Sequence, residues 1–329
     1  MKRYQTKVVV IGGGSGLSVV LRGLKHFTTD VTAIVTVADD GGSSGKLRED
    51  LGMLPPGDIR NCILALSNAE QVMQDLMQFR FSDGKLKGHS LGNMLIAGMV
   101  GMTGGMEEAL TKIHEIFAVT GKVLPVSLDD IVLYAKLSNG LIVKGESKIP
   151  KMVSKYKASI ERVFIEPHAV NALDASVKAI LDADIIMIGP GSLYTSILPN
   201  LLIDDIQAAL LRTKAKKVLA MNLMTQPGET DQMSLMDHVE TIIEHTSIGI
   251  IDSILVNNEH VEFDVEQRYK SEGADMLRLT ETDIAKLELI GVSVIEESLI
   301  EVKAGYIRHD ADKLSERLLD LIDTVRYVK

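Results

Sequence analysis

Short apolar runs alternate along this chain with longer segments in which apolar residues recur every three or four positions. The first run, residues 8–11, is β-branched throughout, which is typical of a strand buried on both faces of a sheet. A helical spacing follows at Leu17, Val20 and Leu24, and residues 31–37 form a second strand pattern. This strand–helix–strand order predicts the beginning of a doubly wound parallel sheet.

The later segments extend the same alternation. Helices are expected at 58–66, at 70–79, after residues 88–93 and at 106–118, and a small β excursion at about 122–145. Strands are then expected at 162–165, 184–188, 217–221 and 253–257, alternating with helices at 169–181, 204–212 and 235–245, and followed by strands near 292–295 and 299–302 and a helix at 310–325. We therefore predict a single α/β domain over 1–329, with a Rossmann-like, mostly parallel sheet and helices on both faces.

The glycine loop after the first strand is a candidate anion site. It contains Gly12, Gly13, Gly14, Ser15 and Gly16. Glycines let the backbone approach a ligand closely, and the first N–H groups of a helix face outward without partners. Leu at position 17 breaks the dinucleotide fingerprint, so the loop indicates a phosphate but no particular cofactor. A tight turn without a ligand is the alternative.

A second loop follows the second strand and begins with Asp39 and Asp40. These carboxylates fit a ribose hydroxyl, a Mg²⁺ ion that also takes substrate phosphates, or a solvated turn with an Asp cap. The adjacent G-G-S-S-G-K is not a P-loop, because Asp40 occupies the opening glycine position and Leu47 replaces the metal-binding hydroxyl.

Two further polar loops, residues 189–196 and 222–230, follow later strands of the predicted sheet. The first offers backbone N–H groups and hydroxyls to a second anionic group, or is a Pro-Gly turn with a serine helix cap. Because carboxyl ends of parallel strands share one edge of a sheet, we expect all four loops to lie there.

Side chains between these loops add candidate chemistry. His89 fits a general acid or base, a phosphate donor or a helix cap, and Arg60 fits a phosphate clamp or a surface ion pair. Asp58 and Asn61 flank Arg60 and are expected to face the same ligand. The sequence has no Cys/His spacing for zinc and no G-x-S-x-G nucleophile elbow.

Composition narrows the class of protein. The formal net charge is −10, which opposes binding to nucleic acid or to anionic membranes, and the chain has no Trp. Cys62 is the single cysteine, so no intramolecular disulfide forms. The N-terminal residues lack a signal-peptide pattern, and the apolar run 91–106 is too short and broken to span a bilayer. We expect a cytoplasmic protein without membrane insertion.

Six motifs together resemble one family. They are I-G-G-G-S-G-L (11–17), A-D-D-G-G-S-S-G (38–45), P-P-G-D-I-R-N-C (55–62), L-G-N (91–93), G-P-G-S-L-Y-T-S (189–196) and N-L-M-T-Q-P-G-E-T (222–230). Over nearly the whole chain the sequence resembles the YvcK-like gluconeogenesis factors of the CofD-like (2-phospho-L-lactate transferase) family. The resemblance implies a Rossmann-like fold, a role in gluconeogenic growth, cell shape and cell-wall precursor supply, and binding of UDP-sugars such as UDP-N-acetylglucosamine or UDP-glucose.

The resemblance also assigns roles to residues. The positions expected to bind the nucleotide phosphates are Gly12, Gly13, Gly14, Ser15, Gly16, Gly189, Gly191, Ser192, Tyr194 and Thr195. The positions expected to line the pocket are Asp39, Asp40, Asp58, Arg60, Asn61, Asn93, Asn222, Thr225 and Gln226. In the transferase branch the acidic loop faces a deazaflavin and Mg²⁺, but here Gly41–Ser44 replace its further acidic residues, which argues against that chemistry.

Three functions follow from these observations. The first is a UDP-sugar sensor that acts through a regulatory protein partner. A homodimer is one candidate assembly of this sensor. The alternative is a CofD-type transferase that moves phospholactate to a deazaflavin, with Mg²⁺ at Asp39 and Asp40 and with Asp39, Asp40 and His89 as catalytic candidates. The third is an NAD(P)-dependent oxidoreductase, which fits the first βαβ unit but lacks a hydride-transfer constellation.

Overall fold

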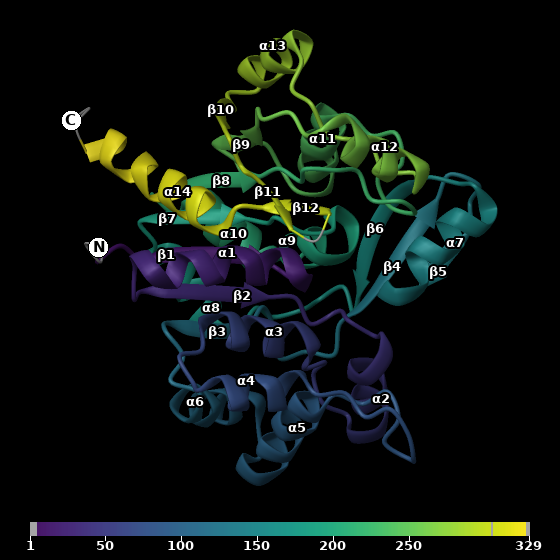
Figure 1. Ribbon diagram of the computed structural model, residues 1–329, viewed down its shortest axis with the longest axis vertical. Coiled ribbons are helices and arrows are strands. Elements are labelled where there is room, and N and C mark those ends of the chain that lie inside the picture. The colour runs from purple at the N-terminus through teal and green to yellow at the C-terminus, as the bar shows by residue number, and fades with distance from the viewer. Residues whose placement is uncertain (1–4, 304, 327–329) are drawn as a thin grey trace.

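A seven-stranded parallel sheet forms the centre of the molecule (Figure 1). The computed structural model describes residues 5–303 and 305–326. The strands, in spatial order, are β10 (Ser293–Glu297), β9 (Ser253–Asn257), β8 (Lys216–Ala220), β7 (Ile185–Ile188), β1 (Val8–Gly12), β2 (Val31–Val35) and β3 (Lys122–Pro125). All six adjacent pairs are parallel. The chain therefore reverses its direction of winding between β1 and β7, and loops after these two strands lie at a topological switch point.

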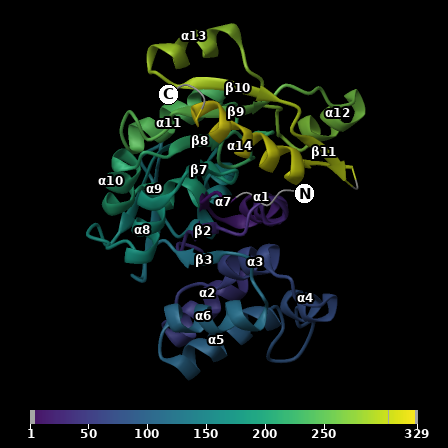
Figure 2. The same ribbon diagram turned by 90° about the vertical axis from the view of Figure 1, so that its left-hand side faces the viewer.

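Helices cover both faces of this sheet, as the alternating pattern predicts. Figure 2 shows α1, α3 and α14 on one face and α8, α9 and α10 on the other. The helices are α1 (Gly14–Phe27), α2 (Gly42–Leu51), α3 (Gly57–Leu66), α4 (Gln71–Gln78), α5 (Leu91–Thr103), α6 (Met106–Ile116), α7 (Ile149–Tyr156), α8 (Asp174–Asp182), α9 (Leu198–Leu201), α10 (Asp204–Arg212), α11 (Leu235–His245), α12 (Phe263–Ser271), α13 (Glu281–Leu289) and α14 (Ala311–Arg326), with a 3-10 turn η1 (Glu146–Lys148) and a π-helix η2 (Leu193–Ile197). No helix in the described ranges is both long and apolar enough to cross a membrane.

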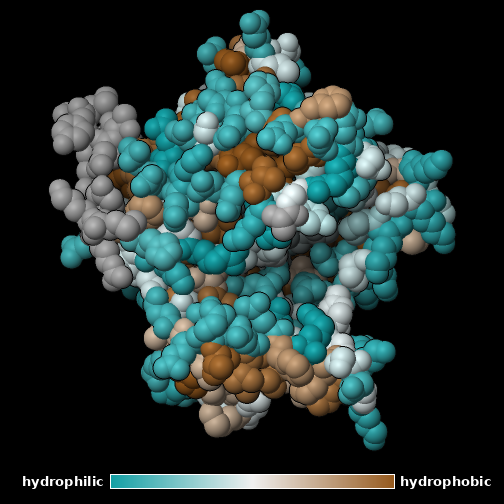
Figure 3. Space-filling view, in the orientation of Figure 1, coloured by the Kyte–Doolittle hydropathy of each residue, from teal (hydrophilic) through white to brown (hydrophobic). Residues whose placement is uncertain are grey.

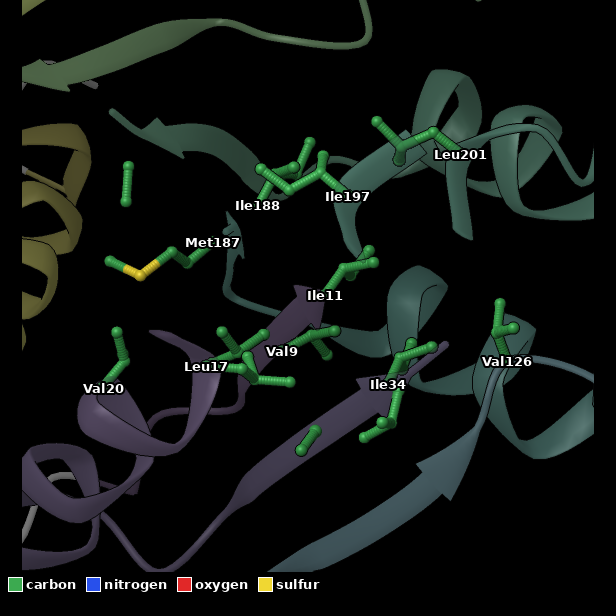
Figure 4. Close-up of a cluster of buried hydrophobic side chains, with 14 of the residues drawn as sticks. Val9, Ile11, Leu17, Val20, Ile34, Val126, Met187, Ile188, Ile197 and Leu201 are labelled. Atoms are coloured by element: carbon green, nitrogen blue, oxygen red, sulfur yellow. The ribbon is translucent and has the colours of Figure 1, made fainter. Parts of the chain in front are cut away.

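The core lies on both sides of the central strands. Every residue of β1, β2 and β7 is buried, which explains their predominantly apolar, β-branched runs. Figure 4 shows Val9 and Ile11 of β1 beside Leu17 of α1. Full burial of an aliphatic side chain of this size contributes about 1.5–3 kcal/mol, so this layer holds β1 and the glycine loop firmly in place.

The predicted β excursion exists, but its membership differs from the expected range 122–145. Residues 122–125 form β3 and pair with β2 in the main sheet, with Lys122 opposite Thr32. The small antiparallel sheet instead combines β4 (Val132–Leu137), β5 (Ile142–Lys144) and β6 (Ile160–Glu166). β6 alternates buried and exposed positions, which is typical of a sheet with one solvated face rather than of a buried parallel strand.

Two other predictions differ from the structure. The helix expected at 169–181 begins only at Asp174, because Ala172 forms a bridge with Ser127 and donates its N–H to the Asp205 carboxylate over 3.1 Å. The strand expected near 299–302 is β11 (Ile300–Lys303), and the sequence pattern missed its antiparallel partner β12 (Tyr306–His309). Residues of β12 form part of the wall of a pocket beside the glycine loop.

Candidate functional site

The glycine loop after β1 packs directly against the loop after β7. A Cβ atom on Gly16 would lie 2.5 Å from the carbonyl oxygen of Pro190, so only glycine permits this approach of α1 to the second loop. Gly14 has a φ of +66°, a conformation that a residue with a side chain rarely adopts. The two loops that the sequence linked to anionic groups are therefore in contact at the switch point.

A third loop, which follows β8, fixes the second one. The Asn222 amide nitrogen donates to the Gly191 carbonyl over 2.8 Å, and its oxygen accepts from the Gly191 N–H at 3.2 Å. The Ser192 hydroxyl donates to the Gln226 side-chain oxygen over 2.7 Å. These bonds confirm that the loops lie together at the carboxyl edge of the sheet.

Between these loops lies a pocket of about 410 Å³, which we call the glycine-loop pocket. Nine of the expected ligand-binding or pocket-lining residues line it: Gly13, Gly14, Ser15, Gly16, Gly191, Ser192, Asn222, Thr225 and Gln226. The opposite wall comes from the end of α12 and from β12. The residues of that wall that sequence reasoning missed include Tyr269, Glu272, Ile307, Arg308 and His309.

The missed wall supplies a cation and two ring systems. Within the described residues, the Arg308 side chain has no ion pair and no hydrogen bond, although Glu301 lies directly opposite it across the hairpin. His309 contacts the Met221 carbonyl oxygen through Nε2 at 3.1 Å, and because a carbonyl only accepts, Nε2 carries the proton. Burial lowers the pKa of His309 to about 4, so the ring is neutral near pH 7 and its Nδ1 is an acceptor.

Four of the expected phosphate-binding residues do not line this pocket. Gly12 ends β1, and its carbonyl accepts from the Asn200 amide at 3.1 Å. Gly189 is buried and has no exposed surface at the pocket. Tyr194 and Thr195 are buried in the π-helix, where the Thr195 hydroxyl donates to Glu229 over 2.9 Å. The geometry gives these residues the role of holding the loop in place.

The acidic candidates are separate from the pocket, on the other side of the glycine loop. We use the name acidic cluster for Asp39, Asp40, Asp58, Glu146 and Glu229, whose charges act on one another. The Asp58 carboxylate accepts from the Gly14 N–H over 2.7 Å, so that amide is not available to a phosphate. Asp39 accepts from the Gly41 N–H and Asp40 from the Ser147 N–H, each at 2.8 Å.

Burial is the first cause of raised pKa values in this cluster. It raises the pKa of Glu146 to about 8, and the charges of Asp39, Asp40, Glu229 and Asp58 add to that effect. Burial also raises the pKa of Glu229 to about 7, against the opposing hydrogen bond from Thr195, and that of Asp58 to about 6, against the bond from Gly14. One oxygen of Glu229 is buried without any hydrogen-bond partner in the described structure.

The remaining candidates tie α2, α3 and the start of α5 to one another. Arg60 donates to the Asn61 side chain over 2.9 Å and to the Ser90 hydroxyl, so its guanidinium links α3 to the start of α5. The His89 Nδ1 lies 3.5 Å from the Ser43 hydroxyl oxygen, and Asn93 contacts Ser44. Asp39, Asp40, Asp58, Arg60, Asn61 and Asn93 are not among the residues that line the glycine-loop pocket, so their place beside a ligand stays a prediction.

Asp39 and Asp40 are not arranged as a ready-made metal cage of protein ligands. Asp39 and Asp40 each use one oxygen to accept a backbone N–H, and among the residues described no group of three His, Cys, Asp or Glu side chains is arranged to hold a metal. Figure 3 shows that this face of the molecule is hollowed between the lower helical region and the upper part. We derive no step through Mg²⁺ from this arrangement.

The sequence and the structure of this chain are similar to those of known proteins. A family model described as 2-phospho-L-lactate transferase CofD matches residues 8–300. A protein from Clostridium acetobutylicum is 51% identical over 316 residues, which cover 96% of this chain and 69% of that protein. A Bacillus subtilis protein named gluconeogenesis factor is 47% identical over 317 residues, covering 96% of this chain and 97% of that protein. The structure of a member of the UPF0052 family from Bacillus halodurans matches with a TM-score of 0.90 and 45% identity, covering 95% of this chain and 99% of that one.

Proposed function

Given that this chain belongs to the 2-phospho-L-lactate transferase CofD family, we propose that it binds a UDP-sugar, such as UDP-N-acetylglucosamine or UDP-glucose, in the glycine-loop pocket. Its biological role would be that of a cytoplasmic gluconeogenesis factor, the name that its Bacillus subtilis relative has, acting on cell shape and cell-wall precursor supply. The observation that carries the proposal is the pairing of the glycine loop with Arg308 across one pocket at the switch point of the sheet.

The diphosphate fits between these two groups. The N–H groups of Ser15 and Gly16 lie in the first turn of α1 and have no partner within the helix. A helix of 14 residues also directs the positive end of its dipole at this point. Arg308 faces the same space from β12 and supplies a full positive charge. Phosphate oxygens would therefore accept from both walls.

The nucleoside and sugar fit the remaining surface. Tyr269 offers a flat ring at the edge of the pocket, and its hydroxyl is held by the Ile307 N–H over 2.9 Å. The neutral His309 ring can accept from an N–H of the base, and the Glu272 carboxylate can accept from ribose or sugar hydroxyls. These groups can accept hydrogen bonds from the N–H and hydroxyl donors that a uridine sugar presents.

The transferase alternative has less support from the site. Its catalytic candidates Asp39, Asp40 and His89 do not line the glycine-loop pocket, and the carboxylates do not form a metal site. We propose instead that occupancy of the pocket is read by a regulatory protein partner through a shift between loop conformations.

Isothermal titration tests this proposal directly. We expect UDP-N-acetylglucosamine to bind with and without Mg²⁺, and NAD and a deazaflavin to bind at least tenfold more weakly. Arg308→Gln should weaken UDP-N-acetylglucosamine binding by at least tenfold, which corresponds to about 1.4 kcal/mol of lost ion pairing. Arg212→Gln, at the exposed end of α10, is the matched control. Absence of UDP-sugar binding, or equal affinity of the Arg308 variant, would contradict the proposal.

A further inference from the structure

We propose that a second anion-binding subsite lies beside the glycine-loop pocket, between α1 and the β11–β12 hairpin, and that it takes a phosphate or carboxylate group. A separate pocket of about 250 Å³ is found there. Its lining residues with basic side chains are Arg22, His26, Lys303, Arg308 and His309. Arg308 and His309 also line the glycine-loop pocket, so the two spaces adjoin.

The strongest observation is that two guanidinium groups meet here without a counter-ion. Neither the Arg22 nor the Arg308 side chain forms an ion pair within 4.0 Å or a hydrogen bond in the part of the chain that the structure describes. Glu301, which faces Arg308 across the hairpin, and Asp312 are on the lining but are not paired with either arginine. Both arginines are exposed to solvent, which screens part of their repulsion, and an incoming oxyanion would offset the part that remains.

The electrostatics agree with this geometry. Burial lowers the pKa of Arg22, and the positive charge of Arg308 lowers it further. Lys25, one turn away on α1, also has a lowered pKa, from burial and from the charge of Arg22. The positive potential of this region therefore extends over neighbouring groups of α1.

Helix packing explains why Arg22 faces the hairpin. A Cβ atom on Gly23 would clash with the Ala311 carbonyl and lie 2.5 Å from the Ser315 hydroxyl oxygen, so α1 and α14 are in close contact at this point. With one side of α1 fixed against α14, Arg22 and His26, which are four residues apart, share one face. That face is turned toward Lys303 and Arg308 of the hairpin. Figure 1 shows the β11–β12 hairpin beside α1.

The size of the space limits the occupant to an oxyanion with a few carbons. An anionic group of this kind can come from two sources. One is a free phosphate ester or carboxylate metabolite, and the other is an acidic group on the nucleotide sugar itself that reaches past Arg308. The subsite and the glycine-loop pocket share Arg308, whose single charge compensates two anions only in part. The expected coupling between the two sites rests on the proposed function. A free anion in the subsite should therefore weaken UDP-sugar binding.

The first experiment uses inorganic phosphate as the probe, titrated into protein saturated with UDP so that the glycine-loop pocket is filled. We expect Arg22→Gln to weaken phosphate binding by at least tenfold and to change the affinity for UDP by less than twofold, because Arg22 does not line the glycine-loop pocket. Arg22→Lys should retain part of the phosphate affinity, and Arg212→Gln should retain all of it. Phosphate binding that is absent, or that is unchanged by Arg22→Gln, would overturn the proposal.

A second experiment separates the two sources of the anion. UDP-glucose and UDP-glucuronate differ only by a carboxylate on the sugar. If the nucleotide supplies the anion, UDP-glucuronate binds the native protein at least fivefold more tightly than UDP-glucose, and Arg22→Gln removes the difference. If a free metabolite supplies it, the two nucleotides bind equally and phosphate weakens both in an Arg22-dependent manner.

The two proposals fail in different ways. If UDP-sugars do not bind but phosphate binds the free protein through Arg22, the proposed function is wrong and the subsite stands. If UDP-sugars bind through Arg308 but neither phosphate nor the glucuronate carboxylate responds to Arg22→Gln, the subsite is wrong and the proposed function stands.

Discussion

The glycine-loop pocket and the acidic cluster lie on opposite sides of the same loop and have opposite electrostatic character. The pocket combines backbone N–H groups and mostly neutral side chains with the charges of Arg308 and Glu272. The cluster combines five carboxylates, three of which have pKa values raised to between about 6 and 8. Gly14 joins the two regions, because its N–H is directed at Asp58 and not at the pocket.

The difference shows that a glycine motif does not by itself define an anion site. Backbone N–H groups at a helix start favour any acceptor, whether it is a ligand phosphate or a carboxylate of the protein. Here α3 brings Asp58 to one side of the loop, and β12 brings Arg308 to the other. The side chains packed against the loop decide where an anionic ligand can bind.

The largest expected effect comes from disrupting the close contact between the glycine loop and the loop after β7. Gly16→Ala places a Cβ atom 2.5 Å from the Pro190 carbonyl oxygen, which is backbone and cannot move aside easily. We expect a loss of about 2 kcal/mol in the free energy of unfolding, from overpacking, and a loss of UDP-sugar binding of at least 30-fold. Urea denaturation and isothermal titration measure the two effects.

A glycine in open space is the control for this change. No heavy atom lies within 4 Å of a Cβ built on Gly98 in α5, so Gly98→Ala should leave binding unchanged and raise stability by about 0.5–1 kcal/mol. Equal stability changes for the two variants would show that the loop contact is not as tight as described.

The next effect tests the acidic side through pH. Glu146 has a pKa of about 8 in the folded protein against 4.5 for its ordinary value, so the folded state disfavours its charged form. Its neutral form is fully tolerated below about pH 4.5, and stability falls as the pH rises from there through about 8. Glu146→Gln removes this loss, so the variant should be more stable than the native protein by about 1–2 kcal/mol at pH 9, an amount discounted for partial exposure.

Urea unfolding at pH 5 and pH 9 checks this prediction. The advantage of Glu146→Gln should shrink at pH 5, where the folded native protein is largely protonated at this position. Glu49→Gln, at an exposed position of α2, should show the same small difference at both pH values. A pH-independent effect of Glu146→Gln would mean that the folded protein does not raise the pKa of Glu146.

The smallest effect measures how far the acidic cluster reaches into the pocket. Glu229 accepts from Thr195 and from Gln226, and Gln226 in turn accepts from Ser192 on the pocket wall. Its pKa of about 7 means that the charge is present at pH 8.5 and largely absent at pH 5.5. Removing a negative charge near a diphosphate should therefore strengthen binding by about two- to threefold at pH 8.5 in Glu229→Gln.

Titration of UDP-N-acetylglucosamine at the two pH values tests this effect. At pH 5.5 the variant and the native protein should bind alike, because both are neutral at this position. The same ratio of affinities at both pH values would show that Glu229 acts on the pocket through its hydrogen bonds and not through its charge.

Much of the fold follows from local patterns in the sequence. The β-branched residues of β1, β2 and β7 are buried throughout, and such runs form strands in almost any context that excludes water. The hairpin strand β12 was missed because Ile307 is its only buried residue, so its hydrophobic signal is too weak to distinguish. The small sheet was misassigned at β3 and β6, since pairing partners far apart in the chain decide which sheet a short strand joins.

The sequence by itself determined the parallel sheet, the position of the glycine loop at its edge, and nine residues of the pocket. These features depend on nearest neighbours along the chain: apolar runs, glycines and the polar residues that directly follow strands. Only the tertiary structure decided that Arg308, almost 300 residues after the glycine loop, completes the pocket and that Asp39 and Asp40 do not line it. The physical reason is that a loop has two sides, and the side on which each distant segment packs depends on long-range burial, which no local pattern encodes.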